Sequence, residues 1–154
     1  RDSPALLVVF LCNHCPYVQA WESRFVDVQR EYAGRGVQLV AINSNDEAAY
    51  PEDDFAHMTA RAKEKAFNFS YLRDESQEIA EAYGPVATPD FYVLDKDRVI
   101  RYRGRLDDNH KDPKAVTKRY LRDALDDVLA GRTPRTPLTP PYGCSIKWKP
   151  DHFA

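Results

Sequence analysis

The sequence has little of what several specialised protein classes require. Its net charge is −2 with both signs interspersed, so it offers no basic surface for nucleic acid or an anionic membrane. No apolar run approaches the roughly 20 residues of a membrane-spanning helix. Three cysteines are too few for a disulfide scaffold. We therefore expect no nucleic-acid partner and no membrane span in this chain.

What remains fits one globular domain. The 154 residues are 43% hydrophobic and 30% charged, which allows a real core. The chain starts at Arg1 instead of a methionine, so a signal peptide, an anchor or an opening hairpin can have preceded it. We expect a cytoplasmic protein, and the composition leaves the oligomeric state open.

Apolar periodicity predicts alternating strands and helices. Short apolar runs predict strands, and three- and four-residue spacing predicts helices. The predicted strands are residues 5–11, 37–42, 69–72, 91–94 and 99–103, and the predicted helices are 16–33, 51–66, 75–83 and 112–130. The order β-α-β-α-β-α-β-β-α indicates an α/β fold with a mixed sheet of about five strands flanked by helices.

The end of the chain has a different composition. Residues 132–141 hold four prolines and three threonines, which predicts an extended strap. We therefore divide the chain into a domain of residues 1–131 and a C-terminal tail of residues 132–154 that packs on the same domain.

Two cysteines stand where the first strand passes into the first helix. They belong to the run Cys12-Asn13-His14-Cys15-Pro16. Proline suits the first helical position, which makes Cys15 the N-cap. A helix N-terminus favours a thiolate, so we expect Cys15 to be the low-pKa nucleophile and Cys12 its partner.

His14, between the thiols, is either a proton relay or an exposed loop histidine. A structural zinc site would combine Cys12, His14 or Cys15 with Cys144 or His110. The chain lacks a second pair of ligands at zinc spacing. We therefore expect no metal and no cofactor.

Thr88-Pro89, before a later strand, is the second element of the predicted site. A cis peptide bond here would present the Thr88 backbone as a strand edge for a substrate peptide. A trans proline opening an edge strand is the alternative. We expect the cis form, with Pro89 facing the two cysteines.

These patterns together resemble the thioredoxin-like superfamily, in its alkyl hydroperoxide reductase/thiol-specific antioxidant (redoxin) branch. The resemblance covers nearly the whole chain, through the Cys-Asn-His-Cys-Pro-Tyr-Val run, residues 71–84, Thr88-Pro89-Asp90-Phe91 and Gly143-Cys144 with the residues after it. The first and last of these are similar to a bacterial thioredoxin-like subfamily. The resemblance implies a thioredoxin-like fold and a redox-active pair of thiols.

The chain departs from the active-site motifs of both thioredoxins and peroxiredoxins. Thioredoxins carry a buried acid at the place of Val9. Peroxiredoxins carry a threonine at the place of Cys12 and a proline at the place of Val8. Peroxiredoxins also place an arginine beside the thiolate, and the resemblance makes Arg73, Arg103 and Arg105 candidates for that position.

The leading hypothesis is a thiol–disulfide oxidoreductase in which Cys15 attacks a disulfide and Cys12 resolves it. The alternatives are a peroxiredoxin-like peroxidase, resolved by Cys12 or Cys144, and a metal- or partner-binding module that has lost catalysis. The implied partners are protein or small-molecule disulfides or peroxides and a cellular thiol reductant.

Cys144 is the third candidate thiol. Ile146 and Trp148 are apolar anchors that predict docking of the tail, and Gly143 permits a close backbone approach. The tail can bring Cys144 to the active site as an auxiliary resolving thiol or a cap. The alternative is a buried, inert cysteine.

Overall fold

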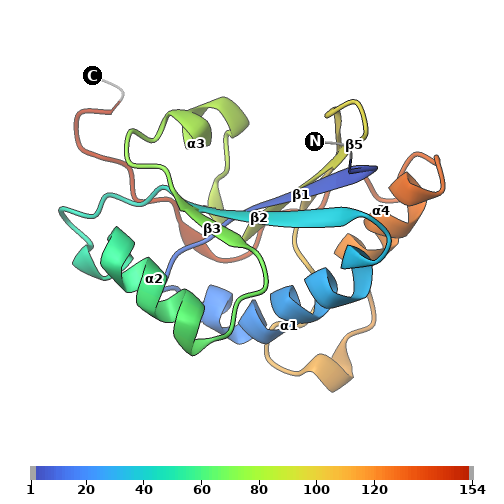
Figure 1. Ribbon diagram of the computed structural model, residues 1–154, viewed down its shortest axis with the longest axis horizontal. Helices are drawn as coiled ribbons and strands as arrows, with labels where there is room; N and C mark the ends of the chain where they lie inside the picture. Colours follow the sequence, from blue (N-terminus) through green and yellow to red (C-terminus); the bar gives the residue numbers. More distant parts are fainter. Residues whose placement is uncertain (1–2, 153–154) are drawn as a thin grey trace.

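The computed structural model of the protein describes residues 3–152. Strands and helices alternate along most of the chain, as the sequence predicts (Figure 1). Their bounds are β1 Ala5–Phe10, α1 Pro16–Ala33, β2 Val37–Asn43, α2 Phe55–Glu64, β3 Ser70–Arg73, α3 Glu78–Tyr83, β4 Ala87–Thr88, β5 Asp90–Asp95, β6 Ile100–Gly104, α4 Tyr120–Leu129 and β7 Cys144–Ser145, with short 3-10 turns at Pro51–Asp53 and Pro113–Ala115.

Five strands form one mixed sheet in the order β3-β2-β1-β5-β6. β1 runs parallel to β2 and antiparallel to β5, which places it at the centre. β2 pairs with β3 in parallel, and β5 with β6 in antiparallel fashion. The predicted α/β class and five-stranded mixed sheet are confirmed. Because β1 is central, the cysteines that follow it lie at the carboxyl end of the middle strand of the sheet.

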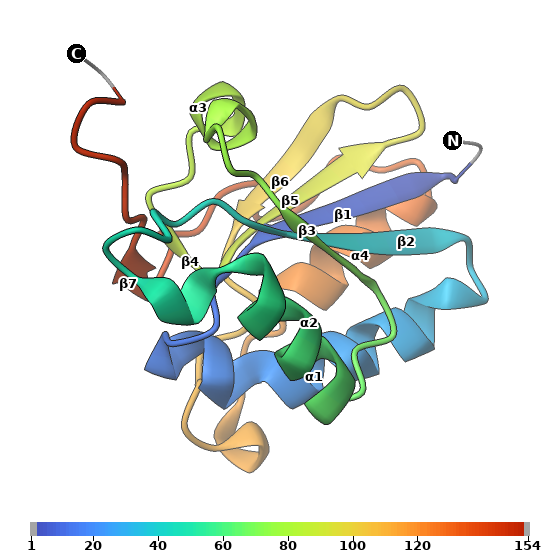
Figure 2. The same cartoon turned by 60° about the vertical axis from the view of Figure 1, so that its left-hand side comes forward.

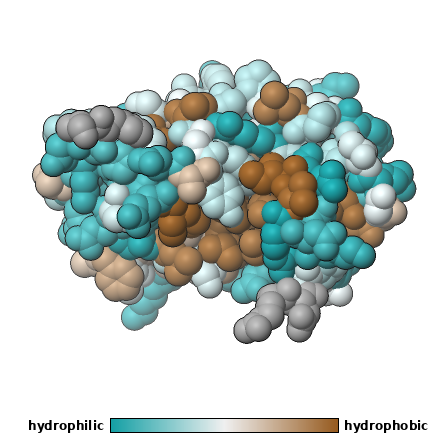
Figure 3. Space-filling model, turned by 90° about the horizontal axis from the view of Figure 1, so that it is seen from above, coloured by the Kyte–Doolittle hydropathy of each residue, from teal (hydrophilic) through white to brown (hydrophobic). Residues whose placement is uncertain are grey.

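Helices cover both faces of the sheet. The larger apolar cluster joins α1 and α4 to one face and includes Trp21, Phe25, Leu121 and Leu125. A smaller cluster on the other face packs α3 against the sheet, and Figure 3 shows apolar residues of that face between polar ones. The heavier packing on the α1 side gives the active-site helix a firm support.

The predicted helix of residues 51–66 is wrong at both ends. Pro51–Asp53 form a separate 3-10 turn, and α2 starts at Phe55 because the Asp54 carboxylate caps it, accepting from the His57 N–H at 2.9 Å. Ala66 lies beyond the helix with a φ of 53°. Phe55 is 63% exposed, so the predicted apolar stripe reduces to one buried residue, Met58.

The last predicted helix starts too early. Asp112 and Pro113 open a 3-10 turn that ends at Ala115, and Val116 is extended. α4 starts at Tyr120, where Leu121 first reaches the core. Two smaller shifts accompany these. α3 starts at Glu78 instead of residue 75, and β3 lies one residue later than predicted.

The tail runs back across the domain. Thr139 and Pro137 exchange backbone hydrogen bonds with Arg103 of β6, at 3.0 and 3.1 Å. Further on, β7 pairs antiparallel with β4, and Figure 2 shows the two side by side near the start of α1. The strand β7 is not predicted by the sequence, while the boundary at residue 131 stays a prediction. Within residues 3–152, no helix is both long and apolar enough to cross a membrane.

Candidate redox site

The active-site loop connects the central strand to the longest helix. β1 ends at Phe10, and Cys15 is the N-cap of α1 with Pro16 in the first turn, as predicted. The side chains of Cys12 and Cys15 are both buried, at 1% and 0% exposure. The two thiols are therefore held beyond the carboxyl end of β1, away from bulk water.

Asn13 fixes the conformation of this loop. Its N–H donates to a carboxylate oxygen of Asp53 at 2.7 Å, and its side-chain amide donates to the Glu52 carbonyl at 2.8 Å. Tyr71 donates to the Asn13 side chain at 2.9 Å. The loop is thus tied to the 3-10 turn after β2, and a rigid loop holds the sulfurs in fixed positions.

Thr88, the residue before Pro89, contacts both cysteines. The peptide bond between them is cis. The Thr88 carbonyl oxygen lies 3.4 Å from the Cys15 sulfur, and the Thr88 hydroxyl lies 3.5 Å from the Cys12 sulfur. Thr88 is 1% exposed. One residue therefore contacts both thiols, through its backbone and its side chain.

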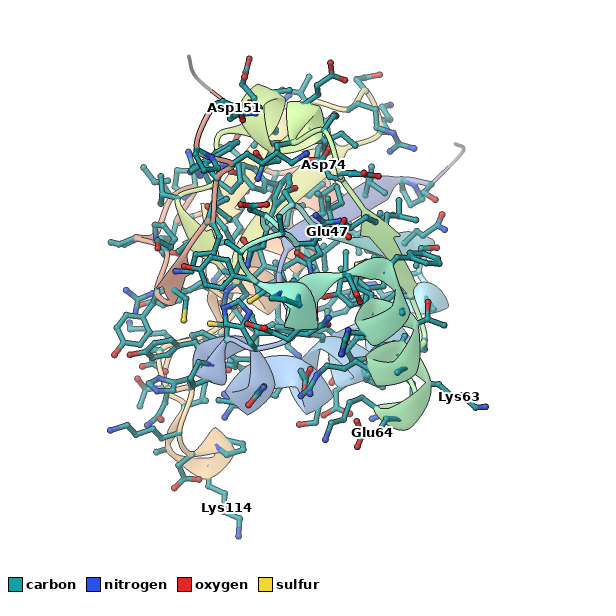
Figure 4. The ribbon with its side chains drawn as sticks, turned by 90° about the vertical axis from the view of Figure 1, so that its left-hand side faces the viewer. Glu47, Lys63, Glu64, Asp74, Lys114 and Asp151 are labelled. Carbon is teal, nitrogen blue, oxygen red and sulfur yellow. The ribbon has the colours of Figure 1, made fainter. Side chains whose placement is uncertain are left out.

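The tail brings the third thiol to the same place. Cys144 pairs with Thr88 in the β4–β7 ladder, and its sulfur lies 2.8 Å from that of Cys15. Figure 4 shows sulfur atoms gathered between β7 and the first turn of α1. The geometry places Cys144 in the site, whereas its role stays a hypothesis.

The three thiols have unequal pKa values. Hydrogen bonding by the Cys12 thiol, then by the Cys144 thiol, lowers the pKa of Cys15, with help from the Val18 N–H in the first helical turn. The same bond to Cys15, and burial, raise the pKa of Cys12. Burial and the neighbouring Cys15 raise the pKa of Cys144. These shifts favour the thiolate form at Cys15 and the thiol form at Cys12 and Cys144.

A buried carboxylate lies beside Cys12. Asp53 is fully buried, and a ring nitrogen of His14 lies 2.5 Å from its carboxylate. The charge of Asp53 contributes to the raised pKa of Cys12. Val9, which stands where thioredoxins have their acid, is buried in the apolar core. An acid is thus present at the site, but it comes from the loop after β2 instead of from β1.

Asp53 is a functional residue that the sequence pattern does not predict. Residues 51–54 fit a helix start, where acids are expected for their effect on the helix dipole. The only available signal was that two acids follow Pro51-Glu52, where one is enough to cap a helix. Capping falls to Asp54, which leaves Asp53 free to face the cysteine loop.

His14, Cys12 and Asp53 hold potential ligand atoms within 4.8 Å of one another. The Asp53 carboxylate is already occupied by hydrogen bonds from three amide groups, those of Asn13, Asn43 and Asn45. The His14 ring nitrogen lies 2.5 Å from the same carboxylate, so hydrogen bonds and an ion pair surround Asp53. We therefore interpret the group as an acid–base cluster.

The three candidate arginines bind elsewhere. Arg73 donates to backbone oxygens of the loop after β2 and pairs with Glu47. Arg103 pairs with Asp90, and Arg105 donates to the Pro140 carbonyl. In the part of the chain that the structure describes, none of the three makes a hydrogen bond to a cysteine. The arginine expected of a peroxide site is not supplied by these residues.

Comparison with known proteins identifies the class. Residues 1–103 match the AhpC/TSA family, and the chain belongs to this family, the redoxin branch of the thioredoxin-like superfamily. Membership of this family makes the protein a thioredoxin-fold oxidoreductase, and it does not specify the substrate. No curated protein matches the chain.

Two similar solved structures extend over nearly the whole chain. A hypothetical protein from Sinorhizobium meliloti is 43% identical, with a TM-score of 0.90, and the match covers 97% of this chain and 82% of that protein. An uncharacterized conserved protein from Geobacillus kaustophilus is 45% identical, with a TM-score of 0.90, over 97% and 79%. A secreted disulfide oxidoreductase from Mycobacterium tuberculosis is 19% identical over 83% of this chain and 81% of its own, with a TM-score of 0.58, and shares the fold.

Proposed function

We propose that the protein is a thiol–disulfide oxidoreductase in which Cys15 is the attacking thiol and Cys12 the resolving thiol. One observation supports this above the others: Cys15, and not Cys12, is the N-cap of α1, where a helix N-terminus stabilises a thiolate, and the pKa of Cys15 is lowered while that of Cys12 is raised. The thiolate is the nucleophile in disulfide exchange, so this inequality assigns the order of attack.

The reaction then follows in two exchanges. The Cys15 thiolate attacks a substrate disulfide, which forms a mixed disulfide and releases one substrate thiolate. Cys12 loses its proton and attacks the Cys15 sulfur, which releases the second thiolate and leaves a Cys12–Cys15 disulfide. A cellular thiol reductant restores the dithiol. The Thr88 backbone, 3.4 Å from the Cys15 sulfur, is the edge along which an extended substrate would lie.

Asp53 and His14 supply the proton acceptor for the second exchange. Formation of the mixed disulfide removes the Cys15 thiolate, and with it the bond that holds the proton on Cys12. The Asp53 carboxylate and the His14 ring each have an atom within 4.8 Å of the Cys12 sulfur. His14 is partly exposed, at 25% of its side chain, so it can pass the proton to water.

Peroxide reduction is the alternative function that the family membership suggests. The Thr88 hydroxyl lies 3.5 Å from the Cys12 sulfur, and the three arginines bind other groups. A peroxide bound at Cys15 would lack the arginine that polarises the O–O bond in peroxiredoxins. We therefore expect disulfide exchange to be the faster reaction.

Stopped-flow oxidation of the reduced protein tests this choice. The reduced wild type is mixed in separate experiments with a disulfide-bonded peptide and with hydrogen peroxide, and the loss of free thiol is followed. We expect the peptide disulfide to react faster at equal concentration, and Cys15→Ser to abolish the reaction. A peroxide rate well above the disulfide rate would overturn the proposal in favour of a peroxidase.

A further inference from the structure

The strand edge at Thr88 is already occupied by the chain itself. β7 adds to β4 in antiparallel register, with Cys144 opposite Thr88 and Ser145 opposite Ala87. This is the mode in which an extended peptide binds an open strand edge. The segment of residues 143–145 therefore takes the place that the proposed function gives to a substrate, and it carries a cysteine at the reactive position.

Gly143 shows how closely this segment fits. A Cβ atom at this position would lie 1.9 Å from the Thr88 carbonyl oxygen, a distance no side chain can adopt. Thr88 is held in turn by its contacts to both active-site sulfurs. Only glycine lets the tail approach this edge, which places the next residue, Cys144, against Cys15.

The tail is anchored on both sides of Cys144. On the C-terminal side, the Lys147 N–H donates to the Asn45 side chain at 2.9 Å, and its carbonyl accepts from the Asp46 N–H at 2.7 Å. On the N-terminal side, the Thr139 hydroxyl bonds to the Tyr102 hydroxyl at 2.7 Å. Neither anchor uses a cysteine sulfur, so neither depends directly on the redox state of the thiols.

From this arrangement we propose that Cys144 is a third redox-active thiol: residues 143–145 act as an internal substrate, and a Cys15–Cys144 disulfide forms during turnover and is opened by Cys12. The inference rests on the proposed function and names its internal partner. Protein substrates would compete with β7 for the Thr88 edge. A strand of two residues is short enough to be displaced by local opening.

The exchange balances in atoms and electrons. Cys15 attacks the substrate disulfide, whose S–S bond breaks and releases one thiolate, which takes up a proton. Cys144 gives up its proton and attacks the Cys15 sulfur, so that the second substrate thiolate leaves and the Cys15–Cys144 bond forms. Cys12 gives up its proton and attacks the same sulfur, and Cys144 leaves as a thiolate that is reprotonated. The substrate disulfide gains two electrons, and the protein ends with a Cys12–Cys15 disulfide.

The geometry and charges suit this sequence. The Sγ atoms of Cys15 and Cys144 must approach from 2.8 Å to about 2.05 Å to bond. The Cys15 thiolate is among the causes that raise the pKa of Cys144, and this cause disappears when Cys15 enters a mixed disulfide. The nearby Lys147 ammonium lowers the pKa of Cys144. Cys144 thus becomes a better nucleophile at the step that uses it.

Peptide mapping tests the proposal on the full chain. The reduced Cys12→Ser variant is treated with oxidised glutathione, quenched with acid and digested with trypsin, which separates the peptides of residues 2–24 and 136–147. We expect these two peptides to be joined by a disulfide, with the glutathione adduct on Cys15 only transient. A persistent adduct with Cys144 free would overturn the proposal.

Two variants complete the test. Cys12→Ser with Cys144→Ser is expected to keep the glutathione adduct on Cys15; if no adduct forms even there, the proposed function itself fails. Gly143→Ala in the Cys12→Ser background is expected to slow the joining about tenfold, the effect of losing roughly one backbone hydrogen bond. An unchanged rate would show that the exchange does not use the β4–β7 pairing.

Discussion

At the scale of single residues, the donor at position 12 sets the reactivity of Cys15. The bond from Cys12 is the largest cause of the low pKa of Cys15. In a Cys144→Ser background, Cys12→Ser keeps a donor, whereas Cys12→Ala removes it. Alkylation of Cys15 by iodoacetamide at varied pH is expected to show a midpoint below the ordinary ~8.5 in the serine variant and a higher one in the alanine variant. Equal midpoints would exclude this hydrogen bond as the cause.

Asp53 is the second residue with a testable role. In a Cys144→Ser background, Asp53→Asn keeps the shape of the side chain and removes its charge. We expect the mixed disulfide on Cys15 to persist about 10²-fold longer near pH 7, the usual effect of losing a general base. The difference should shrink as pH rises, because solvent then takes the Cys12 proton. Quenched-flow mass spectrometry measures this lifetime.

A matched variant at His14 distinguishes a role in proton transfer from a role in holding the loop. His14→Gln is expected to prolong the mixed disulfide in the same direction and to leave the first exchange, the attack by Cys15, unchanged. If both variants slow the two exchanges equally, Asp53 and His14 only maintain the loop.

At the scale of elements, helix α3 depends on one carboxylate outside it. Asp74 accepts from the Ala80 N–H at 2.9 Å and from the Ser44 hydroxyl at 2.7 Å, and Figure 4 shows it beneath the helix. Asp74→Ala is expected to cost about 1–2 kcal/mol in the free energy of unfolding, the loss of a cap and a buried partner. Urea denaturation measures it. Asp123→Ala, an exposed acid of α4, is the control, with an expected change within about 0.5 kcal/mol.

The elements also show where sequence reasoning succeeds. The central strands were predicted because continuous apolar runs identify strands that are buried on both faces. The starts of α2 and α4 were not, since Pro51 and Pro113 each open a 3-10 turn, and proline in a first turn is typical of either structure. Which one forms depends on where the first core contact lies, and Leu121 supplies it for α4.

The site was predictable to a similar degree. The positions of Cys15 and Thr88 follow from local patterns, a helix cap and a Thr-Pro pair before a strand. The place of Asp53 does not, because it depends on Asn13 reaching across to the loop after β2. The register of β7 likewise depends on the fit of Gly143 to the Thr88 carbonyl, which no local pattern reveals.

At the scale of the whole molecule, the thiolate makes the stability of the reduced protein depend on pH. The pKa of Cys15 is lower in the folded state, so its contribution is full above the unfolded value of ~8.5 and is lost as pH falls towards the folded value. The raised pKa values of Cys12 and Cys144 matter only above ~8.5. Between pH 8 and pH 6, the free energy of unfolding of wild type should fall by up to about 1.4 kcal/mol per pH unit relative to that of Cys15→Ser. Urea denaturation under reducing conditions measures both. The same pH dependence in the two proteins would refute this.

The order of attack is the central claim, and trapping the first mixed disulfide tests it most directly. A disulfide-bonded peptide is mixed with two reduced variants that each keep one active-site thiol: Cys12→Ser with Cys144→Ser, and Cys15→Ser with Cys144→Ser. Intact-mass spectrometry follows the adducts at pH 7. We predict rapid, stable adduct formation on Cys15 in the first variant and little on Cys12 in the second. Faster adduct formation on Cys12 would contradict the account.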